Sequence, residues 1–504
     1  MFIKATASIT FACFIVTLYG CFSQQDIPRE SLPFMESRIS QIVTTQGELI
    51  SFRPDMHGNY AVLVDSMIVG VRATNGEVSI PLSEVSRITV ERFDAGKTVL
   101  AVVGGAAVIA LVALATKESC PFVYSYDGTQ YVFDGEPYGG AICEGLKRTD
   151  WCRLEHLKPA SGEYRLLLTN EVDETQFTDE FKLWVVDHRP GLEVMADAEG
   201  ELHTIDKPAP PVQAMDGKKG DILKWVAAQD PLCWETDLLS RDPARAADWR
   251  DTLYLSFLRP EEKQTGKLVV GGSTTLWGSQ MLKRMTELRG VETNNWFDML
   301  RSPSMRQILD AWNGREELYR LQVKVRVANK WVTRGEISGG GPFITEDRIV
   351  VLDLSGVMGD TLQILLAPPA GFWQIDRLAM EYGKDEHINI QEISASRALG
   401  HDGADLLGTL DSTDGRYYMT PEVGQTATLT FRVPPQNAGL ERAVFAKVSG
   451  YYSMHMNTNR PPQTGLLNRI SFEHGFPVRF SLEEFVKWRT GQLKSLQGVR
   501  DGGR

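Results

Sequence analysis

The sequence predicts a mainly β protein made of β-sandwich units with helical insertions, together with a small β module and one apolar helix. Many short runs of β-branched, aliphatic and aromatic residues, separated by Gly, Pro, Asn and Asp turn signals, are typical of sandwiches. At 504 residues the chain is also longer than one hydrophobic core usually organises. Hydrophobic residues make up 42% and charged residues 23%, as in globular proteins, which excludes disorder over most of the chain.

The overall charge argues against nucleic acid as a partner. The chain carries 53 Lys and Arg residues against 65 Asp and Glu residues, a net charge of -12 at pH 7. Proteins that bind nucleic acid generally have a basic surface instead.

Residues 1–20 are predicted to be a secretory signal peptide. A single cation, Lys4, precedes an apolar run from Ala5 to Leu18. The run ends Leu-Tyr-Gly-Cys at Cys21, which resembles the lipobox of bacterial lipoproteins. This resemblance implies lipidation of Cys21, with acyl chains that anchor the protein to a membrane of the bacterial cell envelope.

Residues 22–97 are predicted to form the small β module. Short apolar segments between Glu48 and Arg92 are separated by turn signals at residues 57–59 and at Asn75-Gly76, a pattern that indicates strands and hairpins. The stretch from Asn75 to Arg92 is similar to the end of an SH3-like or Sm-like barrel.

Residues 98–116 are predicted to form the apolar helix. The uncharged run from Thr98 to Ala115 is just long enough to span a membrane, and it is rich in Ala and Gly. A true span after a cleaved signal would leave the rest of the chain in the cytoplasm. The alternatives are an exported segment that packs on or in a membrane, and a buried helix of a soluble fold. We favour export, which places the large C-terminal region outside the cytoplasm.

Residues 117–220 are predicted to be a β-rich domain. Asp127-Gly128 lies between aromatic β-formers and indicates a hairpin, and Glu163–Thr169 and Phe181–Val186 have the composition of strands. The Pro- and Lys-rich stretch 207–220 marks a boundary or an exposed insertion.

Residues 221–460 are predicted to be a β-sandwich region with helical insertions. Helices are expected near residues 222–228, 277–288 and 305–312, and strands at 319–327, 348–354, 361–367, 373–382, 426–433 and 442–452. Residues 461–504 are predicted to hold a C-terminal helix and a tail. Ser481 and Glu484 form a capping-box pattern with Phe480 and Phe485 at the staple positions, which predicts a helix start at Ser481.

The segment from Cys120 to Ile142 resembles a motif of uncharacterised exported bacterial lipoproteins and envelope proteins. The motif reads CPF, an aromatic residue, DG and two further aromatic positions, here CPFVYSYDGTQYVFD. The similarity extends more loosely to Tyr452, over roughly two thirds of the chain. It implies an envelope protein built on β-sandwich units of a galactose-binding-like kind, and it implies no catalytic residues.

Four cysteines remain after removal of the signal and lipidation of Cys21. Cys143 and Cys152 are nine residues apart and could close a short disulfide loop in an oxidising compartment; Cys120 and Cys233 could form a second bridge. Three pairings are open. The spacing lacks a Cys-x-x-Cys motif and does not predict a zinc site.

Motifs for chemistry are weak throughout the sequence, which predicts no catalytic, cofactor-binding or metal-binding residue. There is no His-Glu-x-x-His, phosphate-binding loop or nucleophile elbow. The Asp187-His188 pair and the turn 401–405 are expected to be structural. An acidic cluster could bind Ca²⁺ or cleave glycosidic bonds, but charged strand edges are its commoner role; its members are Glu171, Asp173, Glu174, Asp179 and Glu180.

Aromatic side chains are the remaining candidates for recognition of a sugar or a protein partner, and core packing is the expected role of any one of them. They are Tyr124, Tyr126, Tyr131, Tyr138, Phe372, Trp373, Tyr451 and Tyr452. We therefore expect a non-catalytic, membrane-anchored binding or structural component that faces glycan or protein partners. The alternatives are a carboxylate-dependent, glycan-active hydrolase of the envelope and an assembly or signalling factor of the inner membrane.

Overall fold

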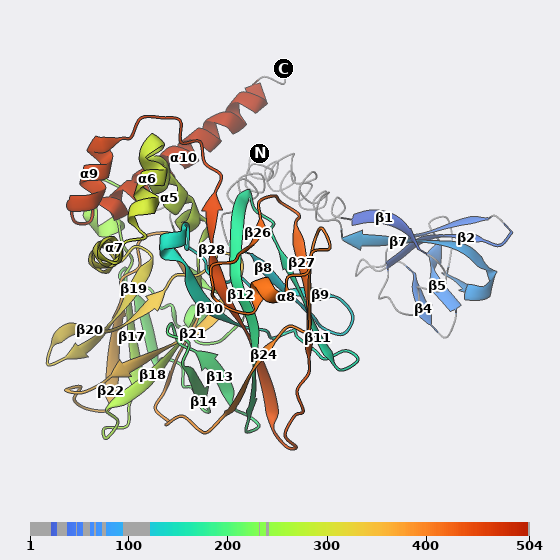
Figure 1. The fold of residues 1–504 in the computed structure, drawn as a ribbon, viewed down its shortest axis with the longest axis horizontal. Helices are drawn as coiled ribbons and strands as arrows, with labels where there is room; N and C mark the ends of the chain where they lie inside the picture. The colour runs from blue at the N-terminus through green and yellow to red at the C-terminus, as the bar shows by residue number, and fades with distance from the viewer. Residues whose placement is uncertain are drawn as a thin grey trace, which may run out of the picture. The chain divides into compact units, whose positions relative to one another are not determined.

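The computed structural model describes residues 22–27, 38–46, 48–53, 61–64, 67–72, 77–93, 121–230, 232–237 and 241–501 (Figure 1). The predicted signal peptide, Cys21, the apolar segment 98–116 and Cys120 lie outside these residues. The chain divides into two compact units, Met1–Ala115 and Thr116–Arg504. Strand accounts for 44% of the structure and helix for 19%, so the prediction of a mainly β protein is confirmed. Within the described ranges, no helix has both the length and the apolar character needed to cross a membrane.

The N-terminal unit contains one antiparallel sheet. Its strands follow the order β1-β7-β2-β3-β5-β4, and β6 pairs with β5. Ile39, Ile42, Phe52, Ile68 and Ile88 are buried in its core. The strands are β1 (Phe22–Ile27), β2 (Arg38–Thr44), β3 (Leu49–Arg53), β4 (Val62–Val64), β5 (Met67–Arg72), β6 (Glu77–Pro81) and β7 (Val85–Phe93).

The larger unit contains a first β-sandwich made of two antiparallel sheets that share one core. One sheet has the order β10-β28-β12-β24, with β26 on β12, and the other has the order β25-β27-β11-β8-β9. Leu166 and Leu429 of the second sheet pack against Leu183 and Val448 of the first. The strands are β8 (Phe122–Tyr126), β9 (Tyr131–Gly135), β10 (Arg148–Arg153), β11 (Glu163–Thr169), β12 (Glu174–His188), β24 (Asn389–Ser394), β25 (Arg397–Gly400), β26 (Tyr418–Thr420), β27 (Thr426–Arg432) and β28 (Glu441–Met454).

The hairpin predicted at Asp127-Gly128 joins β8 and β9, as expected. Gly128 has a φ of 103°, a conformation that glycine adopts without a steric penalty. The carboxylate of Asp127 accepts hydrogen bonds from the backbone N–H groups of Thr129 and Gln130 at 2.7 and 2.9 Å. Its side chain therefore holds the turn in shape.

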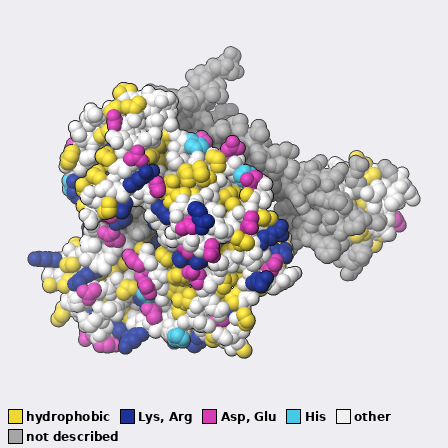
Figure 2. Space-filling model, in the orientation of Figure 1, with side chains coloured by type: hydrophobic (Ala, Val, Ile, Leu, Met, Phe, Trp, Pro, Cys, Tyr) yellow, Lys and Arg dark blue, Asp and Glu magenta, His cyan; other side chains and the backbone are white. Residues whose placement is uncertain are grey.

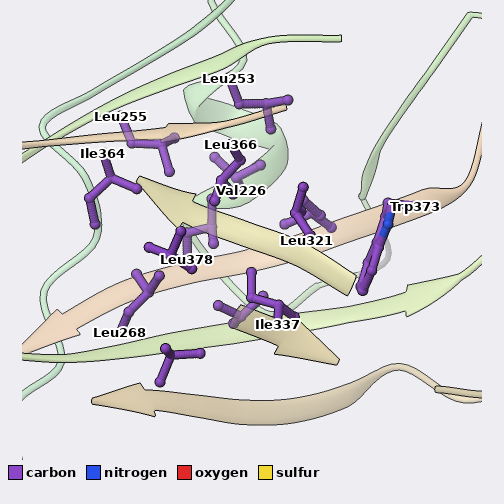
Figure 3. Close-up of a cluster of buried hydrophobic side chains, with 14 of the residues drawn as sticks. Val226, Leu253, Leu255, Leu268, Leu321, Ile337, Ile364, Leu366, Trp373 and Leu378 are labelled. Atoms are coloured by element: carbon purple, nitrogen blue, oxygen red, sulfur yellow. The ribbon is translucent and has the colours of Figure 1, made fainter. Parts of the chain in front are cut away.

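A second β-sandwich lies in the chain between β12 and β24 of the first. Its sheets have the orders β15-β17-β22-β19-β20 and β16-β23-β18-β21. Figure 3 shows Leu255 and Ile364 of one sheet and Leu268 and Leu378 of the other among the side chains of the shared core. The strands are β15 (Gln213–Asp216), β16 (Trp234–Glu235), β17 (Leu253–Leu258), β18 (Thr265–Thr274), β19 (Arg320–Val327), β20 (Lys330–Ser338), β21 (Glu346–Asp353), β22 (Thr361–Leu366) and β23 (Trp373–Glu381).

Strand pairing links segments that lie far apart in the sequence. β12 pairs with β28 over fourteen register positions, from Glu174↔Met454 to His188↔Glu441. The first sandwich therefore takes strands from both sides of the boundary that the sequence places at 220/221. The strands predicted between 319 and 452 all form, at the positions of β19, β21, β22, β23, β27 and β28.

A two-stranded hairpin, β13 (Glu193–Ala196) and β14 (Leu202–Ile205), packs between the two sandwiches. Val194 lies in a cluster with Val186 and Phe445 of the first sandwich. The next residue, Met195, lies in a cluster with Val269, Ile349 and Ala379 of the second. Because successive side chains of a strand point to opposite faces, one short hairpin contacts both sandwiches.

The helices of the larger unit gather largely at one end of it (Figure 1). Thr275 caps α5, because its hydroxyl accepts a hydrogen bond from the Gly278 N–H at 3.2 Å. Pro303 is the first residue of α7, a position at which the backbone N–H has no partner within the helix. The predictions for residues 277–288 and 305–312 are confirmed by α5 and α7. The helices are α4 (Leu223–Val226), α5 (Leu276–Glu287), α6 (Thr293–Met299), α7 (Pro303–Glu316), α8 (Leu407–Leu410), α9 (Thr464–Phe472) and α10 (Phe476–Asp501).

The predicted helix start at Ser481 is wrong. α10 begins at Phe476, directly after Gly475 with its φ of 77°, and Ser481 lies inside the helix. The Ser481 hydroxyl accepts a hydrogen bond from Trp277 Nε1 at 3.1 Å, and Glu484 accepts one from Arg284 Nε at 2.9 Å. The residues of the capping-box pattern therefore hold α10 against α5.

Two leucines of β17 offer a matched test of the second core. Leu255 is 1% exposed and Leu258 is 63% exposed. We expect Leu255→Ala to lower the free energy of unfolding by about 2–5 kcal/mol, because it removes buried methyl groups and leaves a cavity. Leu258→Ala should change it by less than about 0.5 kcal/mol. Urea unfolding of both variants is the measurement, and equal losses would contradict the described core.

Candidate functional site

A cleft of about 2070 Å³ lies in the larger unit, between the two sandwiches and the helices. Its walls come from β10 and the turn before it, the hairpin turn 197–199, strands β20 and β21, and helices α5, α6 and α7. Figure 2 shows a hollow on this face of the unit. Because pockets for small molecules usually enclose about 300–1,000 Å³, this cleft has room for an extended ligand.

The wall from the first sandwich carries an ion pair on β10. Arg148 donates to Asp150 Oδ2 from Nε and Nη2 at 3.2 and 2.9 Å. The same oxygen accepts a hydrogen bond from the Tyr138 backbone N–H at 2.6 Å. Tyr138 is fully buried with a φ of 50°, so Asp150 also supports a strained turn beside the cleft.

The wall from the second sandwich carries a second ion pair, at the start of β21. Arg348 Nη2 donates to Glu346 Oε2 at 2.7 Å. Burial raises the pKa of Glu346, and the charge of Arg348 opposes this shift. The two walls meet here, because Glu136 of the first sandwich accepts a hydrogen bond from the Phe343 N–H of the second at 3.1 Å.

A β-bulge in β23 brings two carboxylates together beside the cleft. The pairing of β18 with β23 shifts between Gly271 and Gly272, and Asp376 is the extra residue of β23. A methyl group at Gly271 would overlap Oδ1 of both Asp376 and Asp347, so the glycine makes room for the pair. Neither Oδ1 atom has a hydrogen-bond partner within the described part of the chain.

Charge around these carboxylates is only partly balanced. Arg377 Nη1 bridges Asp347 and Glu193, at 3.1 Å to each. Burial and the neighbouring Asp347 raise the pKa of Asp376 to about 6, and burial also raises the pKa of Asp347. Asp347 lines the cleft, and Asp376 lies behind it with 7% of its surface exposed.

An aromatic group adjoins one edge of the cleft. Met419, Phe177 and Tyr451 lie side by side across β26, β12 and β28, because their backbones are register partners. Phe177 and Tyr451 stack at 4.4 Å, and Tyr417 lies edge-on to Tyr451 at 5.3 Å. Lys147, which lines the cleft, lies 5.2 Å from the centre of the Tyr417 ring. Figure 2 shows an apolar patch where β12 and β26 lie in Figure 1.

The acidic cluster singled out in the sequence does not come together in the structure. Glu171 accepts a hydrogen bond from the Tyr124 hydroxyl at 2.5 Å. Asp173 contacts His455 at 2.8 Å, and Asp179 forms an ion pair with Lys147. Glu174 and Glu180 are buried on β12. Three of the five are thus interior residues with structural partners.

The other singled-out polar pairs also have structural partners. Asp187 accepts hydrogen bonds from Arg442 at 2.6 and 2.9 Å, and His188 contacts the Arg189 carbonyl. In the turn 401–405, Asp402 accepts a hydrogen bond from the Ala404 N–H at 3.0 Å. Within the described ranges, no group of three or more His, Cys, Asp or Glu side chains is arranged to hold a metal ion.

Four of the eight aromatic candidates are core residues: Tyr138, Phe372, Trp373 and Tyr452. Tyr124 is held by Glu171, and Tyr126 packs against Tyr131, which is 39% exposed. Tyr451 alone among the eight belongs to the aromatic group beside the cleft. Its pKa is raised to about 12 by burial.

Cys143, Cys152 and Cys233 are free thiols in this structure, so the disulfide that could join the first two is not present in it. Burial raises the pKa of Cys143 to about 11 and that of Cys152 well above its usual value. Both thiols are therefore protonated at neutral pH and lack the thiolate that nucleophilic chemistry needs.

Sequence reasoning missed the charged residues of the cleft. Arg148, Asp150, Glu346 and Arg348 lie on strands whose pairing joins distant segments, and nothing in their local sequence marks them. A local signal did exist for the carboxylate pair. Two glycines within a strand pattern, as at Gly271-Gly272, are typical of a bulge.

The structure defines a class of protein: a mainly β chain in which a second antiparallel sandwich is inserted into a first, with a cleft between them. No protein-family model matches the chain, and no curated protein is significantly similar to it.

The buried carboxylate pair predicts an unusual pH dependence. Because folding raises the pKa of Asp376 from 3.8 to about 6, the native state holds its proton more tightly, and this contribution to stability falls as pH rises from 4 to 6. Asp376→Asn should therefore raise the free energy of unfolding at pH 7.5, by roughly 2–3 kcal/mol, and leave it little changed at pH 4. Urea unfolding at both pH values checks this.

Asp187→Asn is the control of opposite sign. Hydrogen bonds from Arg442 lower the pKa of Asp187, so its contribution is present at neutral pH and is lost as pH falls below its usual range. This variant should be less stable than the wild type at pH 7.5. If Asp376→Asn also lowered the free energy of unfolding at pH 7.5, the conclusion that burial and Asp347 make ionised Asp376 destabilising would be wrong.

Proposed function

We propose that the protein is a membrane-anchored component of the bacterial cell envelope that binds a glycan, without catalysis, in the cleft between its two sandwiches. The single observation that carries this proposal is the cleft itself. It encloses about 2070 Å³ and is lined by ion pairs, polar side chains and aromatic rings. A glycan matches such walls. Its hydroxyl groups form hydrogen bonds with charged residues, and the apolar faces of its sugar rings pack on aromatic side chains.

Sequence features support the anchor and the location. The signal peptide and the lipobox at Cys21 favour a lipid-anchored protein, and the apolar segment 98–116 would add a second attachment to the membrane. We place the large C-terminal region outside the cytoplasm, where envelope glycans are found. For the N-terminal unit we propose an SH3-like or Sm-like barrel, and for the sandwiches a galactose-binding-like kind.

The carboxylate pair favours one second candidate, a glycan-active hydrolase. Glycosidases use two carboxyl groups, one of which often has a raised pKa. Asp347 lines the cleft, and the pKa of the adjacent Asp376 is raised to about 6. Asp376, however, is nearly covered, so in the binding proposal the pair is a structural feature of the bulge.

Two matched arginines test the cleft as the binding site. Arg148 lines the cleft with 37% of its side chain exposed, and Arg165 lies on β11 with 39% exposed; each has a carboxylate two residues away on its own strand. Affinity electrophoresis of the full chain in detergent, with neutral and acidic polysaccharides in the gel, measures binding. Arg148→Glu should weaken binding by about tenfold or more, which is ~1.4 kcal/mol, and Arg165→Glu by less than about twofold.

Three outcomes would contradict the proposal. Binding that both substitutions leave unchanged would remove the cleft as the site. Failure to bind any polysaccharide, combined with capture of a protein partner, would assign the surface to proteins. Release of reducing ends from the same polysaccharides, abolished by Asp347→Asn, would favour the hydrolase.

A further inference from the structure

Arg289 has an unusual environment at the helical end of the cleft. It lies two residues after the end of α5 and lines the cleft, and its side chain is half-buried. The guanidinium carbon lies 3.8 Å from the centre of the Trp296 ring, which belongs to α6. Such stacking covers a face of the guanidinium and leaves the N–H donors at its edge available.

Three other arginines, in α5, after α6 and at the start of β19, have carboxylate partners. Arg284 donates to Glu484 at 2.9 Å, Arg301 pairs with Glu144 at 2.8 Å, and Arg320 pairs with Asp310 at 2.9 Å. For Arg289, no ion pair or side-chain hydrogen bond is formed with any residue in the described ranges. Burial is the sole cause that lowers the pKa of Arg289 to about 10, with no opposing negative charge. The group is still protonated at neutral pH.

A second unpaired cation lies nearby on the cleft wall. Arg306 of α7 donates to the carbonyl oxygens of Leu300 and Arg301 at 3.2 and 2.8 Å, and it forms no ion pair with a described carboxylate. In a chain with a net charge of -12, this end of the cleft therefore carries positive charge without a matching carboxylate. A half-buried cation without a counter-charge costs folding free energy, which stacking on Trp296 offsets only in part.

We propose that Arg289, oriented by Trp296, binds a carboxylate of the ligand, and that the glycan bound in the cleft is an acidic polysaccharide. The fork of guanidinium donors matches the two oxygens of a carboxylate, and no carboxylate among the described residues forms an ion pair with it. Arg306 adds positive charge for the next acidic group along the chain. This inference rests on the proposed function and names the chemistry of its ligand.

The test compares two arginines of the helical end, in the full chain. Arg289→Gln removes the unpaired cation, and Arg284→Gln removes a paired one that lies outside the cleft lining. Binding to polygalacturonate, dextran sulfate and dextran is measured by affinity electrophoresis, and thermal unfolding is followed for each variant. Arg289→Lys is the second variant, because it keeps the charge and loses the fork.

Arg289→Gln should weaken binding to polygalacturonate by about tenfold or more and leave binding to dextran unchanged within about twofold. Its melting temperature should equal or exceed that of the wild type, because an uncompensated charge is removed. Arg289→Lys should bind polygalacturonate more tightly than Arg289→Gln and less tightly than the wild type. Arg284→Gln should keep the affinity and lower the melting temperature.

A fall in melting temperature for Arg289→Gln like that for Arg284→Gln would make Arg289 a structural residue and overturn the inference. Preference for dextran sulfate over polygalacturonate would overturn the assignment to carboxylates. Equal binding of all three polysaccharides would sink this inference and leave the proposed function standing. Binding of none, by contrast, would count against the proposed function itself.

Discussion

The packing of one short hairpin between two sandwiches is the constraint on which the rest of the larger unit depends. Val194 of β13 faces the first sandwich and Met195 faces the second, so each sandwich is positioned against the same two strands. The hairpin turn ends at Gly200, whose φ of 87° and contact with the Trp151 ring exclude a larger side chain. The turn residues 197–199 therefore reach the cleft, and the space between the sandwiches stays open above them.

The cleft that results combines two electrostatic situations. Along the sandwich walls, Arg148 pairs with Asp150 and Arg348 pairs with Glu346, while Arg377 balances the charge of Asp347 only in part. At the helical end, Arg289 is stacked on a ring and lacks a carboxylate among the described residues. Sites that hold a buried charge for a ligand trade stability for binding. The cleft therefore differs in charge from one part to another, and its proposed anion-binding part lies at α5 and α6.

Local sequence pattern was sufficient for the strands and insufficient for the site. The alternation in Thr426–Arg432 and the Asp127-Gly128 turn predicted β27 and the β8–β9 hairpin, because both depend on neighbours in the chain. The helix start predicted at Ser481 was wrong because the role of this residue depends on a distant one: its hydroxyl accepts a hydrogen bond from Trp277. The cleft residues are brought together by long-range pairing, and a sequence without register information does not contain that geometry. Arg289 is one arginine among many in sequence, and what distinguishes it is its stacking on Trp296 without a carboxylate partner among the described residues.

Backbone hydrogen exchange of the full chain, measured with and without polygalacturonate, tests the central claim most directly. Binding in the cleft predicts slower exchange at residues 143–153 and 288–306, which contain residues of its lining, and unchanged exchange in the turn 401–405 outside the cleft lining. Slower exchange confined to the turn 401–405, or to other segments outside the cleft lining, would contradict the account. Such a result would place the bound polygalacturonate outside the cleft.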